Sequence, residues 1–172
     1  MSSMQGYSVS YDYTHMYRVK DLNGPLPIPK INENSVLGFL MKKNLARDFV
    51  QLLARSDLSG IYNDGQASMT IFVPIEMDTC YINELDQFQA RQLILYHTLE
   101  KPLCYDFITS SKGMLLNTKI PGSTLFVENI DGDTYINRQV KLLGSHQWGN
   151  SVICFISDML FIDNNPLGNV DI

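Results

Sequence analysis

The chain has 172 residues, of which 45% are hydrophobic and 18% charged, and its formal net charge is −5. A chain of this size can fold as one globular domain that buries about 70% of the surface of its unfolded form, with short appendages. The charges are spread along the sequence and form no cluster of Lys and Arg that could follow a phosphate backbone. We therefore do not expect a nucleic acid as ligand.

Residues 1–30 differ in composition from the rest and are predicted to form an N-terminal arm. Residues 24–29 read Gly-Pro-Leu-Pro-Ile-Pro, and proline favours extended, polyproline-like chain over helix. Aromatic rings such as those of tyrosine are enriched where protein surfaces meet. We predict that the arm binds a protein partner; the alternative is a strand that folds back onto the domain's own sheet. The predicted partner-binding residues of the arm are Tyr7, Tyr11, Tyr13 and Tyr17.

Helices are predicted to dominate the first half of the remaining chain. Asn34 is expected to cap a helix over residues 35–43. A second helix follows Asn44, because apolar residues recur there at helical spacing. Its apolar residues are Leu45, Phe49, Leu52 and Leu53. A further turn around Leu58 and Ile61 leads to a bend at Asn63-Asp64-Gly65.

A strand over residues 68–73 is predicted to end at Pro74, which removes a backbone donor, and Phe72 is expected to be fully buried in it. A third long helix is predicted over residues 86–99. Its apolar side is expected to carry Phe88, Leu93, Leu95 and Tyr96, and its polar side Gln89, Arg91 and Gln92.

The second half is predicted to be β-structure, with strands over residues 124–128, 134–137, 139–143 and 151–156. Asp131-Gly132 is typical of a hairpin turn. Leading helices followed by hairpins indicate an α+β domain. We expect β-sheets packed as a sandwich or wedge, with several short helices along one edge.

Three short segments occur in a fixed order: Thr-Ile-Phe-Val-Pro at residues 70–74, Leu-Ile-Leu-Tyr-His at 93–97 and Asn-Ser-Val-Ile-Cys-Phe-Ile at 150–156. They resemble the fasciclin domain, in which a Thr-x-Phe-x-Pro strand, a helix ending in Tyr-His and a closing Asn-Gly-Val-x-His-Val-Ile-Asp strand follow one another. The resemblance covers residues 31–163, as a divergent member, and leaves residues 164–172 as a short polar tail. It implies a fasciclin-like fold and a binding module.

In that family the Tyr-His pair is associated with adhesion, including integrin contact in some members. The resemblance therefore makes Tyr96 and His97 candidate partner-binding residues. The alternative is that both are partly buried and hold the helix end against neighbouring strands through hydrogen bonds.

The adhesive features of the family are incomplete here. Ser151, Cys154 and Ser157 stand where the family usually has Gly, His and Asp. Ser145-His146 align with its adhesive Asp-Ile step, and the sequence contains no Arg-Gly-Asp. These departures argue against integrin contact.

The sequence offers little for catalysis or for a cofactor. The histidines, His15, His97 and His146, lack the short spacings of a zinc site, and the cysteines never form Cys-x-x-Cys. A Cys154 nucleophile with His97 as its base is conceivable. A buried thiol is the commoner outcome within an apolar run such as residues 152–156. We expect no enzyme, no metal and no cofactor.

Several features favour synthesis inside the cell. The first seven residues lack the basic and apolar regions of a secretory signal, the cysteines number three, and no Asn-x-Ser/Thr sequon occurs. No apolar run approaches the roughly 20 residues needed to cross a bilayer, so direct membrane insertion is not expected.

Two functional hypotheses follow, and the partners expected for the first are other protein subunits of an assembly. The first is a structural subunit of a larger assembly, fixed in place by its arm; a minor capsid protein in the virion of a large DNA virus would be one example. The second is a secreted or cell-surface adhesion module of the fasciclin type.

Overall fold

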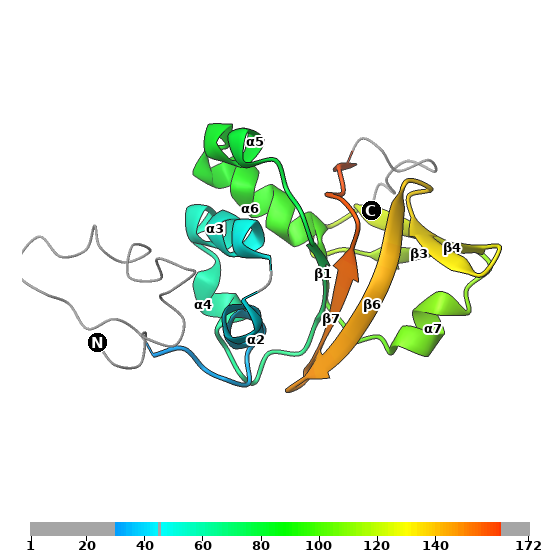
Figure 1. Ribbon diagram of the computed structural model, residues 1–172, viewed down its shortest axis with the longest axis horizontal. Coiled ribbons are helices and arrows are strands. Elements are labelled where there is room, and N and C mark those ends of the chain that lie inside the picture. Colours follow the sequence, from blue (N-terminus) through cyan, green and yellow to red (C-terminus); the bar gives the residue numbers. More distant parts are fainter. Residues whose placement is uncertain (1–29, 45, 163–172) are drawn as a thin grey trace, which may run out of the picture.

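The computed structural model describes residues 30–44 and 46–162, where helices come mostly first and strands mostly later (Figure 1). The helices are α2 (Val36–Lys43), α3 (Arg47–Ser56), α4 (Ser59–Tyr62), α5 (Thr79–Glu84), α6 (Gln87–Tyr96) and α7 (Tyr105–Thr109). The strands are β1 (Thr70–Pro74), β2 (Thr98–Leu99), β3 (Met114–Asn117), β4 (Thr124–Ile130), β5 (Asp133–Ile136), β6 (Val140–Trp148) and β7 (Ser151–Ile156). This mixture confirms the predicted α+β class.

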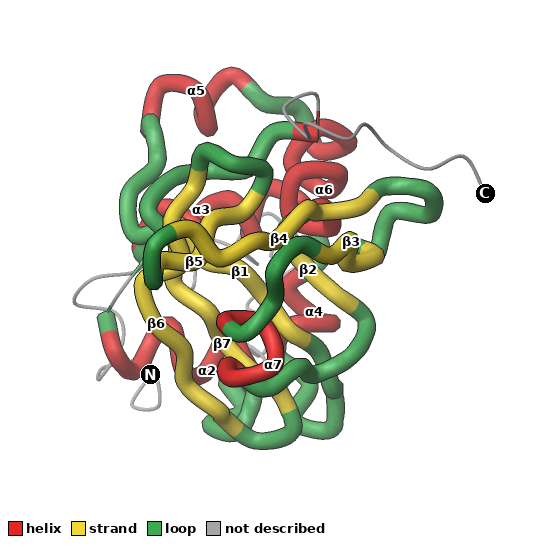
Figure 2. Tube along the Cα trace, turned by 90° about the vertical axis from the view of Figure 1, so that its right-hand side faces the viewer, coloured by secondary structure: helices red, strands yellow, loops and turns green. Residues whose placement is uncertain are grey.

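The strands form one mixed sheet in the order β2-β1-β7-β6-β5-β4-β3, in which only β1 and β7 pair in parallel. The sheet curls until its two edges meet (Figure 2). Leu99 of β2 forms a bridge with Thr118, just after β3, and the Lys119 N–H donates to the Thr98 carbonyl at 2.8 Å. Two parts of one sheet therefore face each other in a nearly closed barrel.

Residues of β1 and β7 alternate between two hydrophobic clusters, because successive side chains of a strand point to opposite faces. Those that face the helices are Ile71, Val73, Ile153 and Phe155. Those that face the barrel interior are Phe72, Val152, Cys154 and Ile156. Both faces of the two strands are thus buried. Phe72 has no exposed surface, as predicted.

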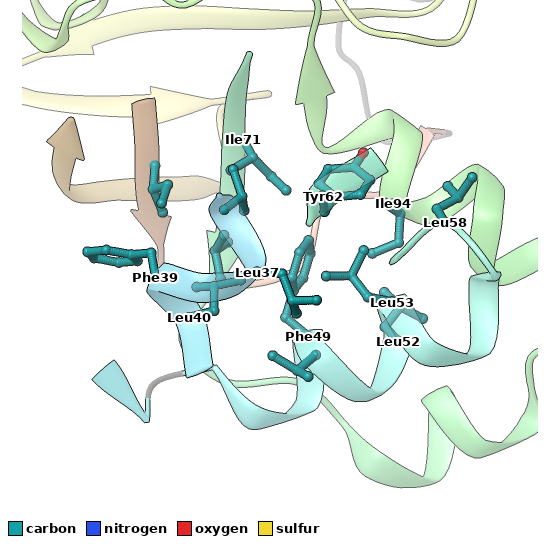
Figure 3. Close-up of a cluster of buried hydrophobic side chains, with 14 of the residues drawn as sticks. Leu37, Phe39, Leu40, Phe49, Leu52, Leu53, Leu58, Tyr62, Ile71 and Ile94 are labelled. Atoms are coloured by element: carbon teal, nitrogen blue, oxygen red, sulfur yellow. The ribbon is translucent and has the colours of Figure 1, made fainter. Parts of the chain in front are cut away.

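Helices α2 to α6 lie together on one side of β1 and β7, whereas α7 lies beyond the other side of the sheet (Figure 1). The cluster between the helices and β1 brings together side chains from distant parts of the sequence (Figure 3). α2 contributes Phe39 and Leu40, α3 contributes Phe49 and Leu53, and β1 contributes Ile71. α6 packs against the same cluster, and the Tyr-His pair lies at its C-terminal end.

Helix α2 begins one residue later than predicted, because Ser35 rather than Asn34 is its N-cap. The Ser35 hydroxyl accepts a hydrogen bond from the Gly38 N–H at 2.9 Å, which satisfies one free donor of the first turn. The close approach of residue 32 to this first turn also requires glycine at residue 38, because a Cβ there would collide with the Asn32 carbonyl oxygen.

Two other predicted boundaries are wrong for a tertiary reason. The helix predicted over residues 86–99 ends at Tyr96, because Thr98 and Leu99 pair with β1 instead. The strand predicted over residues 139–143 continues to Trp148, because β7 supplies partners along its whole length after a bulge between Leu142 and Gly144.

Candidate functional site

Tyr96 occupies the last turn of α6, and only 1% of it is exposed. Its hydroxyl donates to the Thr124 carbonyl at 3.2 Å and accepts from Asn137 Nδ2 at 3.1 Å. Asn137 in turn accepts the Phe126 N–H at 2.9 Å through its side-chain oxygen. The phenol therefore connects the helix end to β4 and to the residue after β5.

His97 follows directly as the C-cap of α6 and has no exposed surface. Its Nε2 accepts the Leu160 N–H at 3.0 Å, so the ring proton is on Nδ1, which donates to the Leu93 carbonyl at 2.7 Å. Burial lowers the pKa of His97 from 6.5 to about 4, although the Leu93 carbonyl acts in the opposite direction. The imidazole is neutral at physiological pH.

Both members of the Tyr-His pair thus direct their polar atoms into the protein. Such a pair sets the position of the surrounding surface and does not present its polar atoms to a partner. The other predicted partner-binding residues, Tyr7, Tyr11, Tyr13 and Tyr17, lie outside the described residues.

A groove of about 380 Å³ lies beside the pair, with Tyr96 among its lining residues. Its walls come from α5 and its C-cap, from α6, from Ile120 between β3 and β4, and from the segment after β7. Phe88 is 67% exposed and Phe161 is 38% exposed, and the ring of Phe161 packs edge-on against Tyr81 at 5.7 Å between centroids. The surface is therefore apolar, aromatic and open to solvent.

The prediction that Phe88 lies on the apolar, core-facing side of α6 is wrong. The helix turns Ala90 and Ile94 toward the core, and Phe88 faces outward with Gln89. Capping causes this orientation in part, since Asp86 accepts the Gln89 N–H at 2.7 Å and Gln89 Oε1 accepts the Asp86 N–H at 2.9 Å, which fixes where the helix begins. Phe88 is therefore part of the solvent-exposed lining of the groove and not of the core.

An acidic hollow of about 350 Å³ adjoins the groove and shares Phe161 with it. Three exposed carboxylates line this hollow: Glu76, Asp78 and Asp158. No Lys, Arg or His occurs among the lining residues of either the groove or the hollow. Asp78 also caps α5 by accepting the Cys80 N–H at 2.9 Å, which leaves Glu76 and Asp158 as the carboxylates without a capping role.

The positions that correspond to the adhesive Asp-Ile step lie on β6. Ser145 pairs with Cys154, and His146 pairs with Ile153. The His146 ring lies 5.3 Å from the ring of Phe39 and 6.0 Å from that of Phe155. This site is separate from the groove, on the strand that passes over α2.

The arrangement does not activate a nucleophile. Cys154 is fully buried in the barrel interior, and burial raises its pKa to about 12. Both ring nitrogens of His97 are engaged by backbone groups, so His97 is not available as a base for the thiol. Within residues 30–44 and 46–162, no group of three or more His, Cys, Asp and Glu side chains could hold a metal ion. None of the helices described there is long and apolar enough to span a bilayer.

The motif residues thus carry the fold: β1 ends at Pro74, and the β1 threonine, Thr70, bridges the Lys101 carbonyl and the Leu103 N–H. The model of the fasciclin domain family matches residues 44–162, which is more than half of the chain. The chain belongs to the fasciclin family. Domains of this family are generally non-catalytic interaction modules.

A comparison with solved structures agrees on the fold. The chain is similar to a FAS1 domain pair from the insect cell adhesion molecule fasciclin I, with a TM-score of 0.64 and 17% identity over 80% of this chain. It spans 54% of that structure, about half the length of a pair. A search of curated proteins found no match.

The groove is the part of the site that the sequence did not indicate. Phe161 and Ile162 come after the closing strand, about 70 residues from α6, and only the tertiary fold places them beside Phe88. One local signal was available: the capping pair Asp86 and Gln89 fixes the start of α6 and hence the outward direction of Phe88.

Proposed function

We propose that this fasciclin domain is a non-catalytic, adhesion-type module that binds a protein partner through the groove beside Tyr96. The supporting observation is the groove itself: aromatic and aliphatic side chains from separate parts of the chain converge there on one apolar surface, and Phe88, Phe161 and Ile162 are its exposed members. Rings that enter a partner's pocket or cover its apolar side chains commonly dominate binding energy. Contiguous exposed apolar surface of this kind marks interaction sites.

The buried Tyr-His pair holds the residues of this surface in position. Tyr96 contributes to the groove lining, and the His97 bond to Leu160 fixes the backbone immediately before Phe161. The pair can therefore be required for binding through its structural role. Its importance for adhesion in relatives needs no direct contact with a partner.

Adhesion is favoured over the capsid hypothesis. The family match and the structural likeness concern fasciclin domains, including one from a cell adhesion molecule, and neither comparison supports a capsid role. Integrin contact is not part of the proposal, since Ser145 and His146 replace the adhesive Asp-Ile step.

Attachment of cells to surfaces coated with the full chain tests the proposal. Phe88→Ser removes the most exposed ring of the groove and should reduce attachment strongly. Phe107→Ser is the matched control, because Phe107 is 52% exposed on α7, which lies at the opposite end of the domain from α5 (Figures 1 and 2). Equal attachment to both variants would exclude the groove, and no attachment to the unmodified chain would oppose an adhesion function.

A further inference from the structure

The side chains that line the groove and the acidic hollow limit which partners can bind there. A segment that fits both must offer apolar side chains to the groove and positive charge to Glu76 and Asp158. Resting on the function proposed above, we infer that the groove receives residues 13–20 of the N-terminal arm of a second copy of this chain. Two copies would then adhere to each other through an arm-in-groove contact.

Charge distinguishes this segment from the other end of the chain. Residues 13–20 read Tyr-Thr-His-Met-Tyr-Arg-Val-Lys and contain two basic residues and no acidic one. Residues 163–172 contain Asp163 and Asp171 and no Lys or Arg. The acidic hollow therefore favours the arm segment, which Asp12 and Asp21 flank but do not enter, over the tail, even though the tail follows directly after Ile162 in the groove wall.

The order of residues in the arm segment suits such a surface. In an extended segment, successive side chains point to opposite sides. Tyr17 and Val19 would share one side and Arg18 and Lys20 the other. If the segment lies along the boundary that Phe161 forms between the groove and the acidic hollow, its apolar side can cover Phe88 and Phe161. Its basic side can then face the carboxylates of the hollow.

The source of the arm is a second copy because of where the arm leaves the domain. The described chain begins at Lys30, whose carbonyl accepts a hydrogen bond from Asn63 Nδ2 at 3.1 Å, next to the end of α4. This start lies away from α5 (Figure 1). Residues 24–29 alternate proline with other residues, and such sequences act as semi-rigid spacers of about 3.1 Å per residue. The arm therefore joins the domain beside α4 and away from α5, which favours the groove of a second copy over the groove of the same copy.

Sedimentation velocity of the full chain tests the inference. We expect self-association that weakens about tenfold or more in two variants, Arg18→Glu/Lys20→Glu in the arm and Phe88→Ser in the groove. An equimolar mixture of the two variants should regain dimers, because it contains one intact arm and one intact groove. Phe107→Ser should associate like the unmodified chain.

A charge reversal checks the electrostatic part. Glu76→Lys/Asp158→Lys should weaken association, and combining it with Arg18→Glu/Lys20→Glu in one chain should restore it. Glu100→Lys/Asp106→Lys, at exposed carboxylates outside both linings, is the charge-matched control. A synthetic peptide of residues 13–20 should compete with association, and the same peptide with both basic residues changed to Glu should not.

Three outcomes would overturn the inference. A chain that stays monomeric at every concentration has no contact between copies. Monomers that bind the peptide only after the arm is altered would show that each arm occupies its own groove. Dimers that are insensitive to Phe88→Ser use another surface. If the unmodified chain does not self-associate but still supports normal cell attachment, this inference alone is rejected and the proposed function stays intact.

Discussion

The Leu160 N–H donates to Nε2 of His97 across 3.0 Å, which ties the end of α6 to the segment that follows the closing strand. The two residues are 63 positions apart in the sequence. The same ring packs edge-on against Phe49 of α3 at 6.3 Å between centroids. One imidazole thereby joins the helical layer, the Tyr-His turn and the wall of the groove.

The first prediction is that His97 makes folding stability depend on pH. The folded protein holds His97 neutral with a pKa of about 4, whereas the unfolded chain has the ordinary value of 6.5. The unfolded state therefore binds more protons between these values, so stability is complete above pH 6.5 and declines as the pH falls to 4. The loss from this residue should reach roughly 3 kcal/mol at the lower limit.

Urea unfolding of the full chain and of His97→Gln between pH 7 and pH 4 isolates this effect, because other titrating groups are common to both proteins. The difference between their free energies of unfolding should shrink as the pH falls. A constant difference would mean that His97 is not held neutral in the folded protein.

The second prediction concerns the barrel interior. Phe72→Ala should lower the free energy of unfolding by about 3 to 5 kcal/mol, because the ring is fully buried and its removal leaves a cavity. Phe107→Ala, at a half-exposed ring on α7, should cost about 1 kcal/mol or less. Chemical denaturation of both variants measures the contrast, and similar losses would place Phe72 outside the core.

Local patterns were sufficient for the elements that local chemistry defines. The strand predicted over residues 151–156 has the observed bounds, because an apolar run lies between turn residues. The Asp131-Gly132 hairpin also forms as predicted, with both residues at positive φ. The short helices α5 and α7 were not predicted, since helices of this length depend on tertiary packing rather than on propensity.

The parallel pairing of β1 with β7 could not be predicted from local sequence, because it joins residues 82 positions apart, such as Thr70 and Val152. The groove has the same origin. The Tyr-His motif pointed to the correct turn, but no local pattern in the sequence distinguishes a buried Tyr-His pair from an exposed one. What decides the matter is Thr124, Asn137 and Leu160, which complete the hydrogen bonds of the pair from β4, from the residue after β5 and from beyond β7.

The third prediction separates the ring of Tyr96 from its hydroxyl. Tyr96→Phe keeps the packing but leaves Asn137 Nδ2 without this buried acceptor, which should cost about 1 to 3 kcal/mol of stability. Tyr105→Phe changes an exposed phenol on α7 and should stay within about 0.5 kcal/mol of the unmodified protein. Thermal and urea unfolding report both values. A neutral Tyr96→Phe combined with lost cell attachment would instead assign the hydroxyl to partner binding.

The last prediction concerns the three thiols, which are all free and differ in burial. Cys80 and Cys104 are exposed, whereas Cys154 lies in the barrel interior with a pKa raised to about 12 by burial. Alkylation reacts with the thiolate, so two labels should appear quickly on the folded protein and the third only with unfolding. Intact mass spectrometry without reductant counts them over time, and denaturant should bring the total to three.

A Cys154→Ser variant should stop at two labels even when unfolded. If Cys154 reacts as fast as the other two in the folded protein, the barrel interior is open to solvent. A total of one label under denaturing conditions would indicate a disulfide and hence an oxidising compartment, which would favour the secreted form of the adhesion module over synthesis in a reducing one.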